Sequence, residues 1–194
     1  MYLFFDIETT GLPKVRDASI TNLNNWPRMV QLAWLQYDEN QNLISEANYI
    51  IKPEGFTIPA DASKVHGITT EKALESGVQL ETALQEFSEV VSKSEIIIAH
   101  NMDFEEKIVG AEFLRSGVKS VLFDKQRFCT MKTTTELCQI TGPYGYKWPK
   151  LSELYYHLFK KDLEYAHDST VDVKACVECF FELMRVGFIK VDKK

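Results

Sequence analysis

The chain has 194 residues, and its 22 lysines and arginines against 28 aspartates and glutamates give a formal net charge of −6. A hydrophobic content of 45% beside 26% charged residues is typical of a globular protein and excludes a chain that is disordered or a coiled coil throughout. The length, without a Pro-, Gly- or Ser-rich linker, predicts a single domain over residues 1–194. The negative charge argues against passive binding of nucleic acid through lysines and arginines, but not against an enzyme that meets phosphate through metal ions.

The sequence carries no sign of export or of membrane insertion. The first apolar run, residues 1–5, is cut short by acidic residues and does not resemble a signal peptide. No run approaches the roughly 20 apolar residues that span a bilayer. Four cysteines are expected to be thiols in a reducing compartment, and the Cys176-x-x-Cys179 pair is interpreted as core packing instead of half a zinc site. We therefore expect a cytoplasmic protein without membrane contact.

Short apolar runs predict strands early in the chain. Met1–Phe5, Met29–Tyr37 and Ala47–Ile51 are compact runs rich in apolar and aromatic residues. The turn-prone segment 38–40 separates the last two runs, which predicts a hairpin. Ile96–Ala99 is expected to be a further, buried strand.

Helical periodicity begins at Leu80. From there to Val91, apolar residues recur at the i, i+3, i+4, i+7 spacing of a helix with one buried face. Helices are also expected over Met102–Gly117, Thr130–Cys138 and Leu151–Phe159, and a last long helix from near Thr170. Strands that alternate with helices after a β-rich start predict a mixed α/β sheet.

Two acids close the first predicted strand. Side chains two apart on a strand face the same way, so Asp6 and Glu8 project together while Ile7 faces the opposite side. Two neighbouring carboxylates repel each other, and oxygen ligands of this kind suit Mg²⁺ or Mn²⁺. The pattern also fits a strand that runs out into solvent with two exposed acids.

A second group of acids follows the strand Ile96–Ala99. That strand passes through His100 and Asn101 into a helix that carries Asp103, Glu105 and Glu106. Junctions between strands and helices are where α/β proteins build their sites. Acids in the first turn of a helix also favour the helix dipole, which needs no ligand.

The third group lies before the last helix. Asp168 or Ser169 is a suitable N-cap, and Asp172 follows Ser169 by three residues, as in a capping arrangement. Capping does not account for His167, which precedes Asp172 by five residues. A neutral imidazole there is suited to take a proton from water.

Together the three segments resemble the DEDDh 3′ to 5′ exonucleases, the proofreading exonuclease family. The matching motifs are DxETTG near the start, HNxxF in the middle and HxxxxD near the end, so the resemblance extends from Asp6 to Asp172. It implies a ribonuclease H-like fold, a mixed β-sheet flanked by helices on both faces. It also implies metal-dependent hydrolysis of phosphodiester bonds at the 3′ end of DNA or RNA, with release of nucleoside monophosphates.

The resemblance assigns roles to individual residues. Asp6, Glu8 and Asp172 would hold two divalent metal ions, Mg²⁺ or Mn²⁺, and His167 would be the general base. The substrate-binding positions would come from two motifs. The first motif would supply Thr9, Thr10, Gly11 and Leu12, which meet the terminal nucleotide, and the middle motif would supply His100 and Asn101. The segment 65–69 also looks like a family element, with a structural role expected. The expected partner is nucleic acid with a free 3′ end, and a polymerase or a second copy of the chain remains open.

The middle acid departs from the family pattern. The family carries an aspartate directly after the aromatic residue of HNxxF, where this chain has Glu105. Asp103 lies two residues earlier, about 200° away around a helix, so only one of the two acids can face the metals. We expect Glu105 to serve as the fourth catalytic acid because Phe104 fixes the register. Ser169 also stands where the family has another small residue, which leaves the five-residue spacing intact.

Two alternative functions of the chain and the role of one aromatic segment remain open. The altered middle acid is compatible with a non-catalytic binding module of the same fold, and a weaker alternative is an acidic α/β domain with chance motif matches. Tyr144-Gly145-Tyr146-Lys147-Trp148 is suited either to stacking on bases or to hinge packing.

Overall fold

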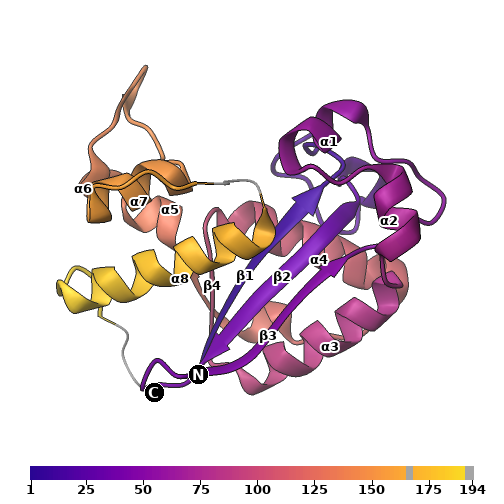
Figure 1. Ribbon diagram of the computed structural model, residues 1–194, viewed down its shortest axis with the longest axis horizontal. Helices are drawn as coiled ribbons and strands as arrows, with labels where there is room; N and C mark the ends of the chain where they lie inside the picture. Colours follow the sequence, from indigo (N-terminus) through magenta and orange to yellow (C-terminus); the bar gives the residue numbers. More distant parts are fainter. Residues whose placement is uncertain (165–167, 191–194) are drawn as a thin grey trace.

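The computed structural model describes residues 1–164 and 168–190, and its centre is a five-stranded sheet in the order β3-β2-β1-β4-β5 (Figure 1). The strands are β1 (Tyr2–Thr9), β2 (Met29–Tyr37), β3 (Leu43–Ile50), β4 (Ile96–Ala99) and β5 (Gln126–Cys129). The first three strands pair antiparallel, whereas β4 runs parallel to β1 and β5 runs parallel to β4. The predicted mixed sheet is confirmed.

Helices cover both faces of this sheet. They are α1 (Ala60–His66), α2 (Thr70–Ser76), α3 (Leu80–Lys93), α4 (Met102–Ser116), α5 (Thr130–Thr133), α6 (Thr135–Cys138), α7 (Leu151–Phe159) and α8 (Ser169–Arg185). Two 3-10 turns, η1 (Leu23–Asn25) and η2 (Leu122–Asp124), and a small hairpin of β6 (Thr141–Gly142) and β7 (Gly145–Tyr146) complete the described elements. Among the described residues, no helix is long and apolar enough to cross a membrane.

The alternation of side chains along β1 divides the core into two layers. Leu3, Phe5 and Ile7 are buried on one face against α3 and α4, where the rings of Phe5 and Phe87 lie 5.3 Å apart. Tyr2 and Phe4 are buried on the other face against α8. Full burial of each large apolar side chain stabilises the fold by roughly 1.5–3 kcal/mol.

The same alternation positions the acids of β1. Because Ile7 belongs to the α3–α4 layer, Asp6 and Glu8 lie on the face where Phe4 packs against Phe180 of α8, with ring centroids 5.3 Å apart. Helix α8 therefore crosses the sheet beside the strand that carries both acids. The expectation that Asp6 and Glu8 share a face opposite Ile7 is confirmed.

Two short helices and one strand extend the predicted elements. Pro59 and Thr69 are the N-caps of α1 and α2, and Gly67 ends α1 with a left-handed φ of 71° that favours glycine. The sequence analysis did not predict these helices, because seven residues present only two turns of periodicity. Strand β5 was also not predicted, and β3 starts at Leu43, four residues before the expected start at Ala47.

The helix expected over Thr130–Cys138 is interrupted. It forms two single turns, α5 and α6, on either side of Thr134, whose φ of −98° and ψ of 9° leave the helical region. The hydroxyl groups of Thr134 and Thr135 donate to the carbonyls of Thr130 and Met131, at 2.8 and 3.3 Å. Such bonds to the preceding turn, together with a run of β-branched residues, bend and weaken helices.

Candidate active site

Three acids from opposite ends of the chain converge at the end of β1. Asp6, Glu8 and Asp172 each offer a carboxylate oxygen, and these atoms lie within 4.8 Å of one another. Asp172 lies in the first turn of α8, whose start is fixed by Asp168, the N-cap that accepts from the Thr170 N–H at 2.8 Å. The structure therefore brings together the three residues that the sequence analysis proposed as metal ligands.

The electrostatics of these acids favours a bound cation. Burial raises the pKa of Asp6 well above its usual value, and the charges of Asp172 and Glu8 raise it further. Burial, with Asp172 and Asp168, raises the pKa of Glu8 to about 8. Within residues 1–164 and 168–190, neither Asp6 nor Glu8 forms an ion pair with a lysine or arginine. Asp6 and Glu8, which repel each other and pair with no lysine or arginine in this part of the chain, fit the oxygen ligand set of a divalent metal ion.

The fourth acid of the cluster is Glu105 on α4. It is only 5% exposed, and its Oε2 accepts a hydrogen bond from the backbone N–H of Ile7 at 3.2 Å. Burial raises its pKa, and the nearby charges of Asp6 and Glu8 raise it further. Asp103 instead forms an ion pair with Lys132 at the surface. The structure thus turns Glu105, and not Asp103, toward the acids of β1.

These acids line a cleft of about 820 Å³ between α1, the start of α4 and the start of α7. In Figure 1, the arrowhead of β1 lies close to α1, while α5, α6 and α7 gather on the other side of α8. All positions predicted to bind substrate line the cleft: Thr9, Thr10, Gly11, Leu12, His100 and Asn101. Leu12 is 83% exposed at its rim.

His100 and Asn101 contribute to the cleft in different ways. The ring of His100 bonds to the Thr130 hydroxyl through Nδ1 at 2.9 Å and to the Pro149 carbonyl through Nε2 at 3.0 Å. Burial lowers the pKa of His100 to about 4, so the ring is neutral at pH 7, and Nε2 is the donor because a carbonyl only accepts. His100 thus anchors Pro149. Asn101 starts α4 with a left-handed φ of 78°, and its buried Oδ1 has no hydrogen-bond partner in the described part of the chain.

The cleft also contains residues that the sequence analysis did not select. His66 of α1 belongs to the segment 65–69, for which a structural role was expected, yet it lines the cleft. Its Nδ1 accepts from the Ile68 N–H at 3.1 Å. Met131 and Lys150 line the cleft too, and Trp148 does so from the aromatic segment that was left open. The resemblance of the segment 65–69 to a family element was the signal that could have identified His66 as a residue of the cleft.

His167, the proposed base, lies outside the described residues, whereas Ser169, the small residue of the third motif, is the first residue of α8. Ser169 is fully buried beside Asp6, and its hydroxyl group lowers the pKa of that carboxyl. A small side chain is therefore needed where α8 passes the acids.

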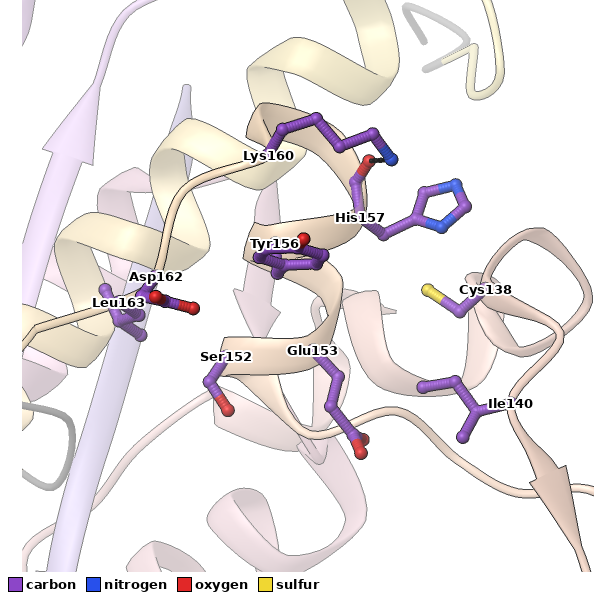
Figure 2. Close-up of a pocket in the computed structure, with 9 residues that line it drawn as sticks. All are labelled: Cys138, Ile140, Ser152, Glu153, Tyr156, His157, Lys160, Asp162 and Leu163. Carbon is purple, nitrogen blue, oxygen red and sulfur yellow. Dashed lines mark hydrogen bonds between the residues drawn. The ribbon is translucent and has the colours of Figure 1, made fainter.

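A second cavity, of about 560 Å³, lies on the outer side of α6 and α7. Figure 2 shows the Cys138 sulfur, the His157 ring and the Glu153 carboxylate around it. Glu153 is paired with Lys147, and Lys160 donates to the His157 carbonyl at 2.8 Å. None of the three clustered acids lines this cavity, so the cleft is the candidate active site.

Sequence comparison identifies relatives among replication proteins. Residues 3–180 match the family RNase_T, described as Exonuclease. The chain is 29% identical over 121 residues to the PolC-type DNA polymerase III of Streptococcus sanguinis, a match that covers 62% of this chain and 7% of the relative. It is 26% identical over 141 residues to the DNA polymerase III subunit epsilon of Buchnera aphidicola subsp. Schizaphis graminum, covering 73% of this chain and 56% of the relative.

Structural comparison gives the same fold. E. coli exonuclease I in complex with a dA16 oligonucleotide matches with a TM-score of 0.73 and 20% identity, over 95% of this chain and 40% of that chain. Its zinc-bound form in complex with single-stranded DNA matches with a TM-score of 0.73 and 22% identity, over the same shares. The family match, which spans most of the chain, together with this ribonuclease H-like fold shows that the chain belongs to the DEDD-type 3′ to 5′ exonuclease family.

Proposed function

We propose that this chain hydrolyses the phosphodiester bond at the 3′ end of a nucleic acid strand, one nucleotide at a time, with Asp6, Glu8 and Asp172 as ligands of two divalent metal ions. The observation that carries the proposal is the convergence of these three carboxylates within 4.8 Å in the cleft of a chain of this family. Their burial and mutual repulsion support the same assignment, because a cation relieves both.

The proposed chemistry combines the acids of the cleft with His167 as the base. Mg²⁺ or Mn²⁺ supplies charge stabilisation at the phosphate and lowers the pKa of a water molecule when bound. His167 accepts the proton of the attacking water, whose oxygen forms a bond to phosphorus as the bond from phosphorus to the 3′ oxygen breaks. The leaving oxygen takes up a proton and becomes the new 3′ hydroxyl group, and the product is a nucleoside 5′-monophosphate.

Other residues of the cleft hold the substrate. The backbone of residues 9–12 meets the terminal nucleotide, supported by the Thr10 hydroxyl, which accepts from the Arg28 N–H at 2.9 Å and ties this segment to the start of β2. Glu105 acts as the fourth acid, held in place by Ile7. Asn101 offers the substrate a buried amide oxygen that has no other partner in the described residues.

The biological setting is proposed from the relatives. Two of them are named as DNA polymerase III proteins and the structural neighbours were solved with single-stranded DNA, so we propose DNA as the substrate, a polymerase as a possible partner and the cytoplasm as the location. The chain spans only 7% of the PolC-type relative and 40% of the exonuclease I chain.

The direction and product of hydrolysis test this proposal. A single strand labelled at its 5′ end should shorten to a ladder in Mg²⁺, and a strand labelled at its 3′ end should release labelled mononucleotide at once. A strand with a 3′ phosphorothioate linkage should resist. Binding of the strand without any shortening would contradict the proposal and favour the non-catalytic binding module.

A further inference from the structure

An exposed tryptophan lines the cleft, although it lies outside all three of the family motifs in the sequence. Trp148 is 43% exposed and lines the same cleft as the acids. The guanidinium group of Arg16 lies 4.7 Å from the centre of its ring, and the ammonium group of Lys132 lies 5.6 Å from it. Two segments far apart in sequence therefore meet at the cleft around one aromatic ring.

The backbone on both sides of Trp148 is fixed to the rest of the protein. Lys147 pairs with Glu153 of α7 at 2.5 and 2.8 Å, and Glu153 also accepts from the Lys150 N–H at 2.7 Å. The Pro149 carbonyl accepts from His100. A ring carried by such a segment loses little freedom when it binds a ligand, which favours affinity.

The cleft adjoins a side pocket of about 320 Å³ that is lined by two basic and two acidic residues. Leu12, Asn101 and Phe104 line both spaces, and Arg16 and Lys107 line the side pocket. Its acids are Asp17 and Asp103, and each pairs with a lysine: Asp17 with Lys107 at 3.7 Å and Asp103 with Lys132. Arg16 forms no ion pair within the described residues.

We propose that Trp148 and Arg16 form the binding site for the nucleotides that precede the terminal one, with an unpaired base stacked on Trp148 and a phosphate bound by Arg16. This inference rests on the proposed function, because the terminal nucleotide is taken to occupy the space between residues 9–12 and the acids. Stacking on an aromatic side chain needs a base whose face is free, so the site selects single strands over duplexes. The contact of Arg16 with an exposed ring contributes only about 0.5–1 kcal/mol, so Arg16 can move to a phosphate.

Substitution of Trp148 distinguishes the contribution of this site to binding from the contribution of the acids to turnover. Loss of one base stack costs about 1–3 kcal/mol, so Trp148→Ala should raise KM and the Kd for a fluorescein-labelled dT12 strand roughly 5- to 150-fold, with kcat little changed. Trp148→Phe should keep most of the affinity. Tyr144→Ala is the matched control, since Tyr144 lies four residues earlier, is fully exposed and does not line the cleft.

A ligand that reaches only the terminal site provides the second arm. Thymidine 5′-monophosphate has no group in the place of the preceding nucleotide, so it should inhibit Trp148→Ala with the wild-type Ki. Arg16→Ala should weaken binding of dT12 and reduce the slope of log Kd against log salt by about 0.7, the value for one phosphate contact on a single strand.

The outcomes are distinct from those of the proposed function. Unchanged binding of dT12 by Trp148→Ala, in a protein with wild-type circular dichroism, would overturn the inference. An equal rise in the Ki of thymidine 5′-monophosphate would also overturn it, since Trp148 would then contact the terminal nucleotide. Binding of dT12 is measured without Mg²⁺, so a wild-type protein that binds through Trp148 but does not hydrolyse would refute only the proposed function.

Discussion

The Glu105 carboxylate accepts a hydrogen bond from the backbone N–H of Ile7 at 3.2 Å, midway between the two acids of β1. Strand β4 pairs with β1 only along residues 2–4 of β1, so the sheet leaves this N–H available on that side. Glu105 of α4 is thus hydrogen-bonded to β1, the strand that carries Asp6 and Glu8.

Substitutions at position 105 test the role of this bond. Glu105→Ala should lower kcat strongly, because it removes both the acid and the partner of a buried N–H. Glu105→Asp should preserve or raise kcat, since the family carries aspartate here and misplacement by about 1 Å can cost about 100-fold. Turnover of one 3′-labelled single strand by each variant provides the measurement.

Asp103→Ala is the control for the register, because Asp103 pairs with Lys132 at the surface and does not face the acids. We expect a small effect on kcat. A severe loss with this variant beside a nearly neutral Glu105→Ala would transfer the role of the fourth acid to Asp103.

His167→Ala should lower kcat by about 10²- to 10⁴-fold, the usual loss when a positioned proton acceptor is removed. Mn²⁺ affinity, measured by calorimetry, should remain close to that of the wild-type protein. Loss of Mn²⁺ binding in this variant would make His167 a metal ligand and refute its assignment as the base.

Glu8 should make the metal-free protein lose stability as the pH rises from 4.5 to 8. The folded state raises the pKa of Glu8 from 4.5 to about 8, so it binds more protons than the unfolded state between these values, and the free energy of unfolding falls as pH rises through them. Glu8→Gln should show a smaller fall between pH 4.5 and 8 in urea denaturation with EDTA. Mg²⁺ at pH 8 should restore stability to the wild-type protein more than to Glu8→Gln. A steeper fall in the variant would contradict the raised pKa.

His100 should produce the opposite dependence on pH. Its pKa falls from 6.5 to about 4 in the folded state, so the unfolded state binds more protons in this window and stability decreases as pH drops through it. The difference in unfolding free energy between the wild-type protein and His100→Gln should therefore shrink from pH 6.5 to 4. A constant difference for His100→Gln would show that the ring titrates normally.

The parts of the site that follow from local patterns could be predicted from the sequence. The period of two along β1 determined that Asp6 and Glu8 share a face, and the spacing from Phe104 determined that Glu105 turns inward. The N-cap at Asp168 was one of two positions that the sequence offered, and it placed Asp172 in the first turn of α8. The family motifs then related these segments to one another.

The remaining parts depend on contacts between distant segments. The place of Trp148 is set by Glu153 and by the bond from His100 to Pro149, residues 49 positions apart, and neither contact leaves a pattern in the local sequence. The break in the helix at Thr134 follows from a side-chain hydrogen bond to the preceding turn. The bounds of the two seven-residue helices follow from their cap residues. Periodicity over longer windows does not detect such features.

Asp6, Glu8 and Asp172 are proposed to hold the metal ions used for hydrolysis. The most direct measurement combines, on one preparation of Asp6→Asn, a calorimetric titration with Mn²⁺ and the release of mononucleotide from a 3′-labelled strand. We predict weakened Mn²⁺ binding and a loss of turnover of at least about 10³-fold, because metal ligation and charge stabilisation fail together, in a protein that stays folded. Wild-type turnover by Asp6→Asn, or turnover by the wild-type protein that persists in excess EDTA, would contradict the account.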